Sequence, residues 1–244
     1  MSFNKIIFHL SLSEKEGFMD WVEKFDYFLF DFDGLLVNTE HLHHQAYVNM
    51  LKRRGYDLDW SFLEFCQKAH IESTGLKEAI YAKFPRLEEE EPSWRVLYEE
   101  KKKAYLSLLI SGKVHLMQGV EKLLINLKEK GKRSCVVTNS LKEHTEIAQA
   151  RLPILQTIDH WITREDYSLP KPDPECYKRA IELYSQIGDR IIGFEDTLKG
   201  LKALLHTPVK PVLISSIDYP ELTATIDPNV SHFSSFSEIK ESLV

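Results

Sequence analysis

Asp31 and Asp33 stand one residue apart at the end of the aromatic-rich run 27–32, and Gly34 follows them. Such a run is typical of a buried strand, and open parallel sheets bind ligands beyond the carboxyl ends of their strands. Carboxylate oxygens placed there suit Mg²⁺, which leaves its other positions to water and substrate phosphate. An Asp-Gly turn with a capping aspartate gives the same short pattern, so the pair is not sufficient by itself.

Further polar residues follow later runs of the same kind. They are Thr138, which ends the run 134–138, and Asn139 after it, Lys171 in the proline-rich segment 169–174, and Glu195 and Asp196 after residues 190–194. Hydroxyl, N–H and ammonium groups suit a phosphate, whereas the carboxylates add to a cation site. Each residue also has a simpler interpretation, as a helix cap or a surface loop. Because these groups all come at strand ends, we predict that they converge on one site.

The elements that must position these residues alternate along the chain. Strands are predicted at 27–32, 134–138, 160–163, 190–194 and 211–215, and helices at 120–130, 142–150, 174–184 and 198–206. This order predicts an α/β fold, in which right-handed βαβ units form a parallel sheet covered on both faces. Between residues 39 and 113 only helices are predicted, at 42–54, 60–69, 76–84 and 94–109.

The chain is therefore divided into three parts. Residues 1–24 are predicted to be an N-terminal extension with a helix from Glu14 to Lys24, residues 25–38 and 114–244 the α/β core, and residues 39–113 a helical domain inserted after the first strand. The acidic run 88–91 is interpreted as a solvated loop. The basic run 101–103 is interpreted as the solvated face of a helix.

Composition excludes several classes of protein. A hydrophobic fraction of 43% and a charged fraction of 28% are ordinary for a soluble globular chain. The net charge of −6 disfavours nucleic-acid and membrane-surface binders, and the apolar stretch 6–8 is too short to span a bilayer. Cys66, Cys135 and Cys176 lack the spacing of a zinc site or a disulfide framework, which indicates a reduced, cytoplasmic setting.

The chain carries four motifs in succession: DFDGLLVNTE, VVTNS, KPDP and GFEDT. They occur in the order found in the haloacid dehalogenase superfamily, which the chain resembles over residues 26–215. The helical insertion after the first motif is similar to that of the β-phosphoglucomutase-like and phosphoglycolate-phosphatase-like branch. This resemblance implies a Rossmann-like core with strand order 5-4-1-2-3. It also implies that the insertion is a cap domain over the active site.

The resemblance assigns a role to each motif residue. Asp31 would be the nucleophile and a Mg²⁺ ligand, and Asp33 the general acid and base, with its backbone carbonyl on the metal. Thr138, Asn139 and Lys171 would bind the phosphoryl group, and Asp196, with Glu195 nearby, would complete the metal site. Mg²⁺ and an ammonium can offset the repulsion between a carboxylate and a phosphate. The expected function is therefore Mg²⁺-dependent hydrolysis of a small phosphorylated metabolite through an aspartyl-phosphate.

Two alternatives remain open. A sugar phosphomutase of this branch carries a cap arginine where the alignment places Glu72, which favours hydrolysis. A non-catalytic binding protein would usually have lost a catalytic residue, and every one of them is present. His43 lies twelve residues after Asp31, where the mutase branch has a histidine that contacts the acid/base. For His43 both this contact and an exposed position remain open, and His41 and His44 are expected to be exposed.

Overall fold

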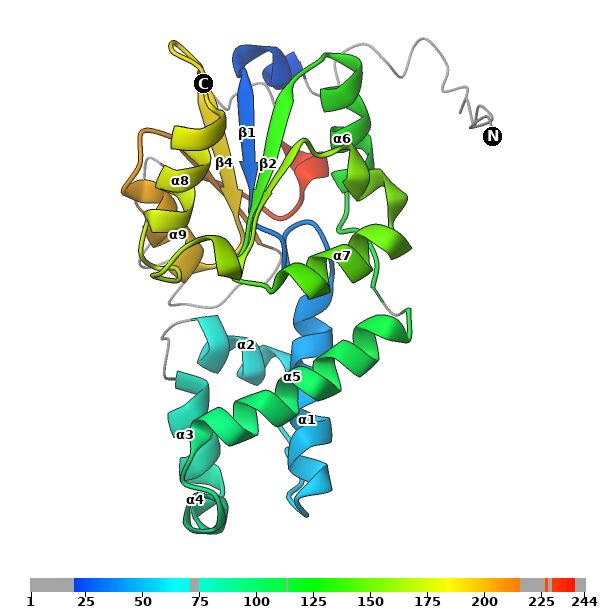
Figure 1. Cartoon of the computed structure of the whole chain (residues 1–244), viewed down its shortest axis with the longest axis vertical. Coiled ribbons are helices and arrows are strands. Elements are labelled where there is room, and N and C mark those ends of the chain that lie inside the picture. The colour runs from blue at the N-terminus through cyan, green and yellow to red at the C-terminus, as the bar shows by residue number, and fades with distance from the viewer. Residues whose placement is uncertain (1–19, 71–74, 113, 216–226, 228–229, 240–244) are drawn as a thin grey trace.

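A six-stranded parallel sheet forms the centre of the protein in this computed structural model, which describes residues 20–70, 75–112, 114–215, 227 and 230–239. Its order is β3-β2-β1-β4-β5-β6, and β2, β1 and β4 are labelled side by side in Figure 1. The strands are β1 (Tyr27–Phe30), β2 (Arg133–Val137), β3 (His160–Ile162), β4 (Ile191–Glu195), β5 (Lys210–Ile214) and β6 (Ser231–Phe233). The predicted order of five strands is confirmed, and β6, which was not predicted, extends the sheet beside β5.

Strand β1 explains why helices cover both faces of the sheet. Successive side chains of a strand point to opposite faces, and in β1 all four are apolar and buried. Phe28 and Phe30 join the core under α6 (Val120–Glu129) and α7 (Lys142–Arg151). Tyr27 and Leu29 join the core under α8 (Glu175–Tyr184) and α9 (Leu198–Leu205). The register aligns β1 with β2 and β4, so the carboxyl ends of these strands lie at one edge.

The chain before β1 also belongs to this core. Asp20–Lys24 forms a 3₁₀ helix, and its Trp21 is only 1% exposed, with its ring 6.1 Å from Phe28 and 5.8 Å from Phe194. Within the last five residues of the predicted extension, Trp21 and Val22 therefore pack into the core. The rest of that extension, with most of the helix predicted from Glu14, lies outside the described residues.

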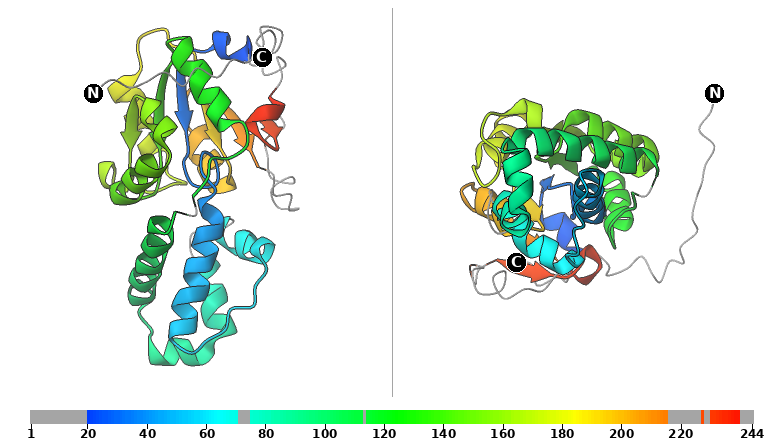
Figure 2. Two further views of the ribbon diagram at one scale, coloured as in Figure 1. Left: turned by 90° about the vertical axis from the view of Figure 1, so that its right-hand side faces the viewer. Right: turned by 90° about the horizontal axis from the view of Figure 1, so that it is seen from below.

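The insertion forms a helical unit beyond the carboxyl edge of the sheet (Figures 1 and 2). Its helices are α1 (Thr39–Arg53), α2 (Phe62–His70), α3 (Gly75–Lys83), α4 (Pro85–Glu90) and α5 (Trp94–Ile110). They have a hydrophobic cluster of their own, against which Trp60 and Trp94 pack. The acidic run, predicted as a loop, is largely helix α4, because Pro85 starts it at a favourable position and Leu87 is buried.

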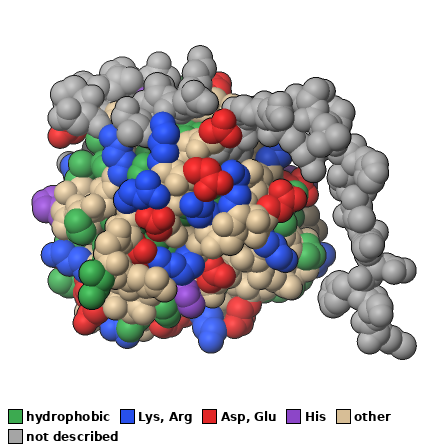
Figure 3. Space-filling model, turned by 90° about the horizontal axis from the view of Figure 1, so that it is seen from above, with side chains coloured by type: hydrophobic (Ala, Val, Ile, Leu, Met, Phe, Trp, Pro, Cys, Tyr) green, Lys and Arg blue, Asp and Glu red, His purple; other side chains and the backbone are tan. Residues whose placement is uncertain are grey.

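Short 3₁₀ helices at Pro153–Thr157, Arg164–Asp166 and Phe236–Glu238 complete the described structure. In β3, which precedes the second of these helices, Trp161 packs its ring 5.6 Å from that of Phe32. Acidic and basic side chains are interspersed over the described part of the face in Figure 3. No helix among the described residues has both the length and the apolar character needed to cross a membrane.

Candidate active site

Asp31 lies at the carboxyl end of β1, where its backbone N–H donates to Phe194 in β4 at 3.0 Å. Its buried carboxylate accepts a hydrogen bond of 2.5 Å from the ammonium of Lys171. Burial raises the pKa of Asp31 to about 8 in the metal-free protein, Lys171 opposes that rise, and the charges of Glu195 and Asp33 add to it. The pair predicted from the first and third motifs is therefore in direct contact.

Lys171 is held among buried acceptors. Its ammonium lies 2.7 Å from the Val137 carbonyl, 2.6 Å from Glu195 Oε1 and 3.1 Å from the Tyr177 hydroxyl, which itself donates to Glu195. Burial alone would lower the pKa of Lys171, but the charges of Asp31 and Glu195 outweigh it and raise that pKa well above its ordinary value. A permanent positive charge therefore lies beside Asp31.

Three buried carboxylates form a candidate metal centre. Ligand oxygens of Asp31, Glu195 and Asp196 lie within 4.8 Å of one another. Asp196 Oδ1 and Glu195 Oε2 are buried and have no hydrogen-bond partner among the described residues. Burial, followed by the charge of Asp31, raises the pKa of Asp196 well above its ordinary value. Unpartnered carboxylate oxygens in such a cluster fit a hard cation such as Mg²⁺.

Two glycines leave room for these carboxylates, because the backbone at Gly34 and Gly200 passes close to them. A Cβ on Gly200 would lie 1.9 Å from Glu195 Oε2, and one on Gly34, whose φ is +80°, would lie 2.2 Å from Asp196 Oδ2. Side chains at either position would push the acidic groups out of place. The glycine after the Asp31-Phe32-Asp33 sequence is therefore required both by its turn conformation and by the neighbouring Asp196.

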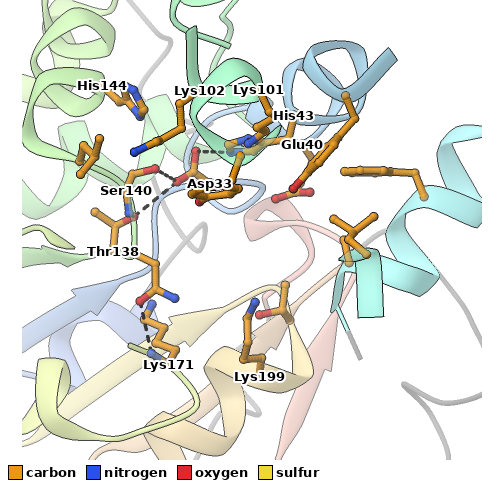
Figure 4. Close-up of a pocket in the computed structure, with 18 of the residues that line it drawn as sticks. Asp33, Glu40, His43, Lys101, Lys102, Thr138, Ser140, His144, Lys171 and Lys199 are labelled. Atoms are coloured by element: carbon orange, nitrogen blue, oxygen red, sulfur yellow. Dashed lines mark hydrogen bonds and ion pairs between the residues drawn. The ribbon is translucent and has the colours of Figure 1, made fainter. Parts of the chain in front are cut away.

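Asp33 points away from that cluster, toward the insertion and the loop after β2 (Figure 4). One carboxylate oxygen accepts hydrogen bonds from Thr39 at 2.6 Å and Tyr105 at 3.3 Å. The other accepts from Ser140 at 2.5 Å and, more weakly, from Thr138 at 3.4 Å. Burial alone would raise the pKa of Asp33, but His43 and these hydroxyl groups outweigh it and hold the pKa well below its ordinary value.

His43 contacts the site, which settles the question left open by the sequence. Its Nε2 lies 3.6 Å from Asp33 Oδ1, its Nδ1 lies 2.6 Å from the ammonium of Lys101, and its ring stacks on Tyr105 at 4.1 Å. His41 is exposed as predicted. The prediction for His44 was wrong, because its half-buried ring stacks on Phe65.

Lys101 and Tyr105 were missed by the sequence analysis. Lys101 is 5% exposed, so its interpretation as part of a solvated basic face was wrong, whereas Lys103 is exposed. Burial lowers the pKa of Lys101 to about 8, against the charges of Glu40 and Asp33. A signal was present, since Lys101 follows Leu97 and precedes Tyr105 by four residues each, on one buried stripe of α5.

The loop after β2 carries the two remaining predicted residues. Thr138 is buried, and its hydroxyl accepts a hydrogen bond of 2.9 Å from the N–H of Ser140. The side-chain oxygen of Asn139 accepts from the Tyr167 hydroxyl at 2.6 Å and from the N–H of Lys171 at 3.3 Å. Asn139 therefore ties this loop to the Lys171 segment. Its predicted contact with phosphate remains a prediction.

A cavity of about 310 Å³ opens between the sheet edge and the insertion. Asp31, Asp33, Thr138, Asn139, Lys171 and Asp196 line it from the core, and His43, Tyr98, Lys101 and Lys102 line it from the insertion. Its size is at the lower end of the range for small-molecule sites. The predicted residues other than Glu195 therefore share one pocket, and Glu195 contacts it through Lys171. Glu72, on which the mutase argument depends, lies outside the described residues.

Residues 28–214 match the family described as haloacid dehalogenase-like hydrolase, and the chain belongs to that family. The resemblance and the prediction of a hydrolase enzyme are thereby confirmed. The chain is 28% identical to protein CbbY of Cereibacter sphaeroides over 181 residues, which cover 72% of this chain and 77% of that protein. It is 29% identical to validoxylamine A 7'-phosphate phosphatase of Streptomyces hygroscopicus subsp. limoneus over 202 residues, or 82% and 90% of the two chains.

The fold also matches solved structures. Crystalline CbbY from Rhodobacter sphaeroides in complex with phosphate has a TM-score of 0.68 at 22% identity, covering 88% of this chain and 96% of that one. A hydrolase of the same superfamily from Entamoeba histolytica has a TM-score of 0.70 at 24% identity, covering 88% and 95%. At these identities the likeness establishes the arrangement of strands and helices.

Proposed function

We propose that the protein is a Mg²⁺-dependent phosphatase that hydrolyses a small phosphorylated metabolite through an aspartyl-phosphate at Asp31. One observation carries the proposal: the Asp31 carboxylate touches the Lys171 ammonium and belongs to the same cluster of buried carboxylates as Asp196. The candidate nucleophile, a lysine suited to phosphate and a carboxylate cluster suited to a metal ion therefore lie together at the carboxyl edge of the sheet. The name of the validoxylamine phosphate phosphatase supports phosphate-ester chemistry.

Two transfers complete the proposed reaction. Asp31 attacks phosphorus, the bond from phosphorus to the leaving oxygen breaks, and that oxygen takes a proton from Asp33. Asp33 then removes a proton from water, which attacks the phosphorus and releases inorganic phosphate with Asp31 restored. Because its donors hold Asp33 ionised, the acid step requires an incoming phosphate ester, whose negative charge raises the pKa of a neighbouring carboxyl.

The remaining groups would position the phosphoryl group and neutralise its charge. Lys171 and Thr138 are proposed to bind the phosphoryl oxygens, since positioning with charge neutralisation is most of what phosphoryl transfer requires. Mg²⁺ bound by Asp31, Asp196 and the backbone carbonyl of Asp33, with Glu195 beside them, would offset phosphate charge and keep Asp31 ionised. Tyr177 contacts both Lys171 and Glu195 Oε1, so the Glu195 oxygen without a hydrogen-bond partner among the described residues is Oε2.

The insertion is proposed to act as a cap. Residues 39–113 would close over residues 25–38 and 114–244 and exclude water from the pocket. The contacts of Thr39, His43 and Tyr105 with Asp33 support this role, because they connect both long helices of the insertion to the proposed acid/base. The cysteines are free and buried, which supports a reducing, cytoplasmic setting.

Release of phosphate from p-nitrophenyl phosphate tests the proposal. The full chain should turn over this ester with Mg²⁺ and lose that activity with chelator. Asp31→Asn should reduce turnover by about 10³-fold or more, and the wild type, quenched during turnover, should carry a phosphoryl group on the peptide containing Asp31. Asp57→Asn, the same chemical change at an exposed residue outside the pocket, is the control. Equal turnover by Asp31→Asn and wild type would refute the proposal.

A further inference from the structure

A tyrosine behind the pocket completes the surroundings of Lys171. Tyr177 lies in the first turn of α8, is fully buried and belongs to the core cluster that contains Tyr27 and Leu29. It is not among the described residues that line the cavity, whereas Lys171 and Asp31 are. Tyr177 therefore acts on a bound ligand through the residues that it touches.

The ammonium of Lys171 has more acceptors around it than it has hydrogens. Four acceptor atoms lie within 3.1 Å of its nitrogen: Asp31 Oδ1 at 2.5 Å, Glu195 Oε1 at 2.6 Å, the Val137 carbonyl at 2.7 Å and the Tyr177 hydroxyl at 3.1 Å. An ammonium carries three hydrogens and accepts none. Because a phosphoryl oxygen would be a further acceptor, Lys171 must give up a contact in order to bind it.

Glu195 Oε1 is the acceptor that can release Lys171 at the least cost. It already accepts a second hydrogen bond, from the Tyr177 hydroxyl. The Asp31 carboxylate and the Val137 carbonyl have no second side-chain donor among the described residues. A buried carboxylate oxygen that lost its last donor would cost its full desolvation penalty, and the Tyr177 hydroxyl prevents this loss at Glu195.

The ring and the hydroxyl of Tyr177 can be separated by substitution. The centre of the ring lies 4.8 Å from the Lys171 nitrogen, within the range of a cation–π contact. Phenylalanine keeps this contact and the packing in the core, but it removes the hydrogen bond to Glu195. Tyr177→Phe therefore isolates the effect of the hydroxyl.

We infer that Tyr177 is a positioning residue for Lys171, because its hydroxyl remains as the donor to Glu195 Oε1 when the ammonium turns toward a phosphoryl oxygen. The inference rests on the proposed phosphatase function and adds a residue to the phosphate-binding part of the same site. Phosphate affinity then depends on a hydroxyl group that the phosphate does not touch.

Binding of inorganic phosphate at saturating Mg²⁺ measures this effect without turnover. Isothermal titration calorimetry of the full chain gives the phosphate Kd, and a separate titration gives the Mg²⁺ Kd. Tyr177→Phe should weaken phosphate binding by about tenfold, the scale of one hydrogen bond to a charged group. Its Mg²⁺ Kd should stay that of the wild type, because the unpartnered Glu195 oxygen, Oε2, is not the one that Tyr177 contacts.

Tyr81→Phe is the control for the loss of a tyrosine hydrogen bond. Tyr81 is 4% exposed, lies in the insertion away from the pocket lining, and donates to the Glu91 carbonyl at 2.9 Å. This variant should leave the phosphate Kd and the turnover unchanged. In Lys171→Met the ammonium is absent, so adding Tyr177→Phe to that variant should not weaken phosphate binding further.

The outcomes separate the inference from the phosphatase. Equal phosphate affinity of Tyr177→Phe and wild type would overturn the inference, as would a loss of Mg²⁺ affinity as large as the loss of phosphate affinity. The same loss on adding Tyr177→Phe to Lys171→Met would also overturn it. In these cases turnover of p-nitrophenyl phosphate by the wild type keeps the phosphatase. A wild type that neither binds phosphate nor turns over the ester would refute both.

Discussion

Lys101 is predicted to lower the stability of the folded protein while supporting its turnover. Its ammonium is buried beside His43 Nδ1 at 2.6 Å, and burial lowers its pKa from an ordinary 10.5 to about 8. A shift of this size, taken at about 1.4 kcal/mol per unit, corresponds to about 3 kcal/mol. The charged lysine therefore destabilises the folded state by that amount at neutral pH.

Lys101→Met keeps the length of the side chain and removes its charge. The variant should gain about 2 kcal/mol in free energy of unfolding at pH 7, since about 1 kcal/mol is lost with the hydrogen bond to His43. The sign of the pH dependence follows from proton linkage. Below pH 8 the folded and the unfolded chain both hold the Lys101 proton, so the full cost of burying the charge is present. Between pH 8 and 10.5 the folded state releases the proton first, so the cost declines, and above that range it is absent.

Urea unfolding of the metal-free protein measures this difference. At pH 7 the variant should be the more stable protein, and at pH 10 its charge-related advantage should shrink to about 1 kcal/mol or less. Turnover should fall at the same time, because His43 loses the group that holds its Nδ1. Lys103→Met, at the exposed position, should change neither quantity. Lower stability of Lys101→Met at pH 7, or a gain that does not depend on pH, would refute the reasoning.

Three other predictions concern the carboxylate cluster and the helix that follows it. Gly200→Ala places a Cβ 1.9 Å from Glu195 Oε2 and should weaken Mg²⁺ binding by about tenfold or more. Titration of tryptophan fluorescence with Mg²⁺ measures this affinity, and an unchanged affinity would contradict the close packing. Mg²⁺ at 100 times its Kd should stabilise the chain by about 2.7 kcal/mol, seen as a higher Tm that chelator reverses and Asp196→Asn abolishes. Thr197 caps α9, because its hydroxyl accepts a hydrogen bond of 3.1 Å from the N–H of Gly200. Thr197→Ala should therefore lower the free energy of unfolding, measured with urea, by about 1 kcal/mol. An unchanged free energy would mean that water replaces the cap.

The convergence of the motif residues could be predicted because it depends on topology. Asp31, Thr138 and Asp196 each follow a strand, and the carboxyl ends of neighbouring parallel strands must meet at one edge. Lys171 was grouped with the strand ends, but in the structure it lies nine residues after β3 and follows no strand directly, so topology alone does not account for its contact with Asp31. The helical insertion was predictable from the period of its apolar residues.

Other features depend on tertiary contacts that local patterns do not contain. Strand β6 has three residues and becomes a strand by pairing with β5, so its own sequence carries little signal. Lys101 stands in a run of lysines, and charge alone predicts that all of them are solvated. Its spacing from Leu97 and Tyr105 was a local signal for the buried stripe of α5, but the acceptor that makes a buried ammonium possible there, His43 Nδ1, comes from another helix.

The distribution of tryptophans gives each half of the molecule its own optical reporter. Trp21 packs against the sheet and Trp161 lies in its strand β3, whereas Trp60 and Trp94 lie in the helical unit. Replacing the tryptophans of one half by phenylalanine leaves a chain whose tryptophan fluorescence reports on the other half alone. Loss of order in the two halves at different urea concentrations would then be visible as separate transitions in a single polypeptide.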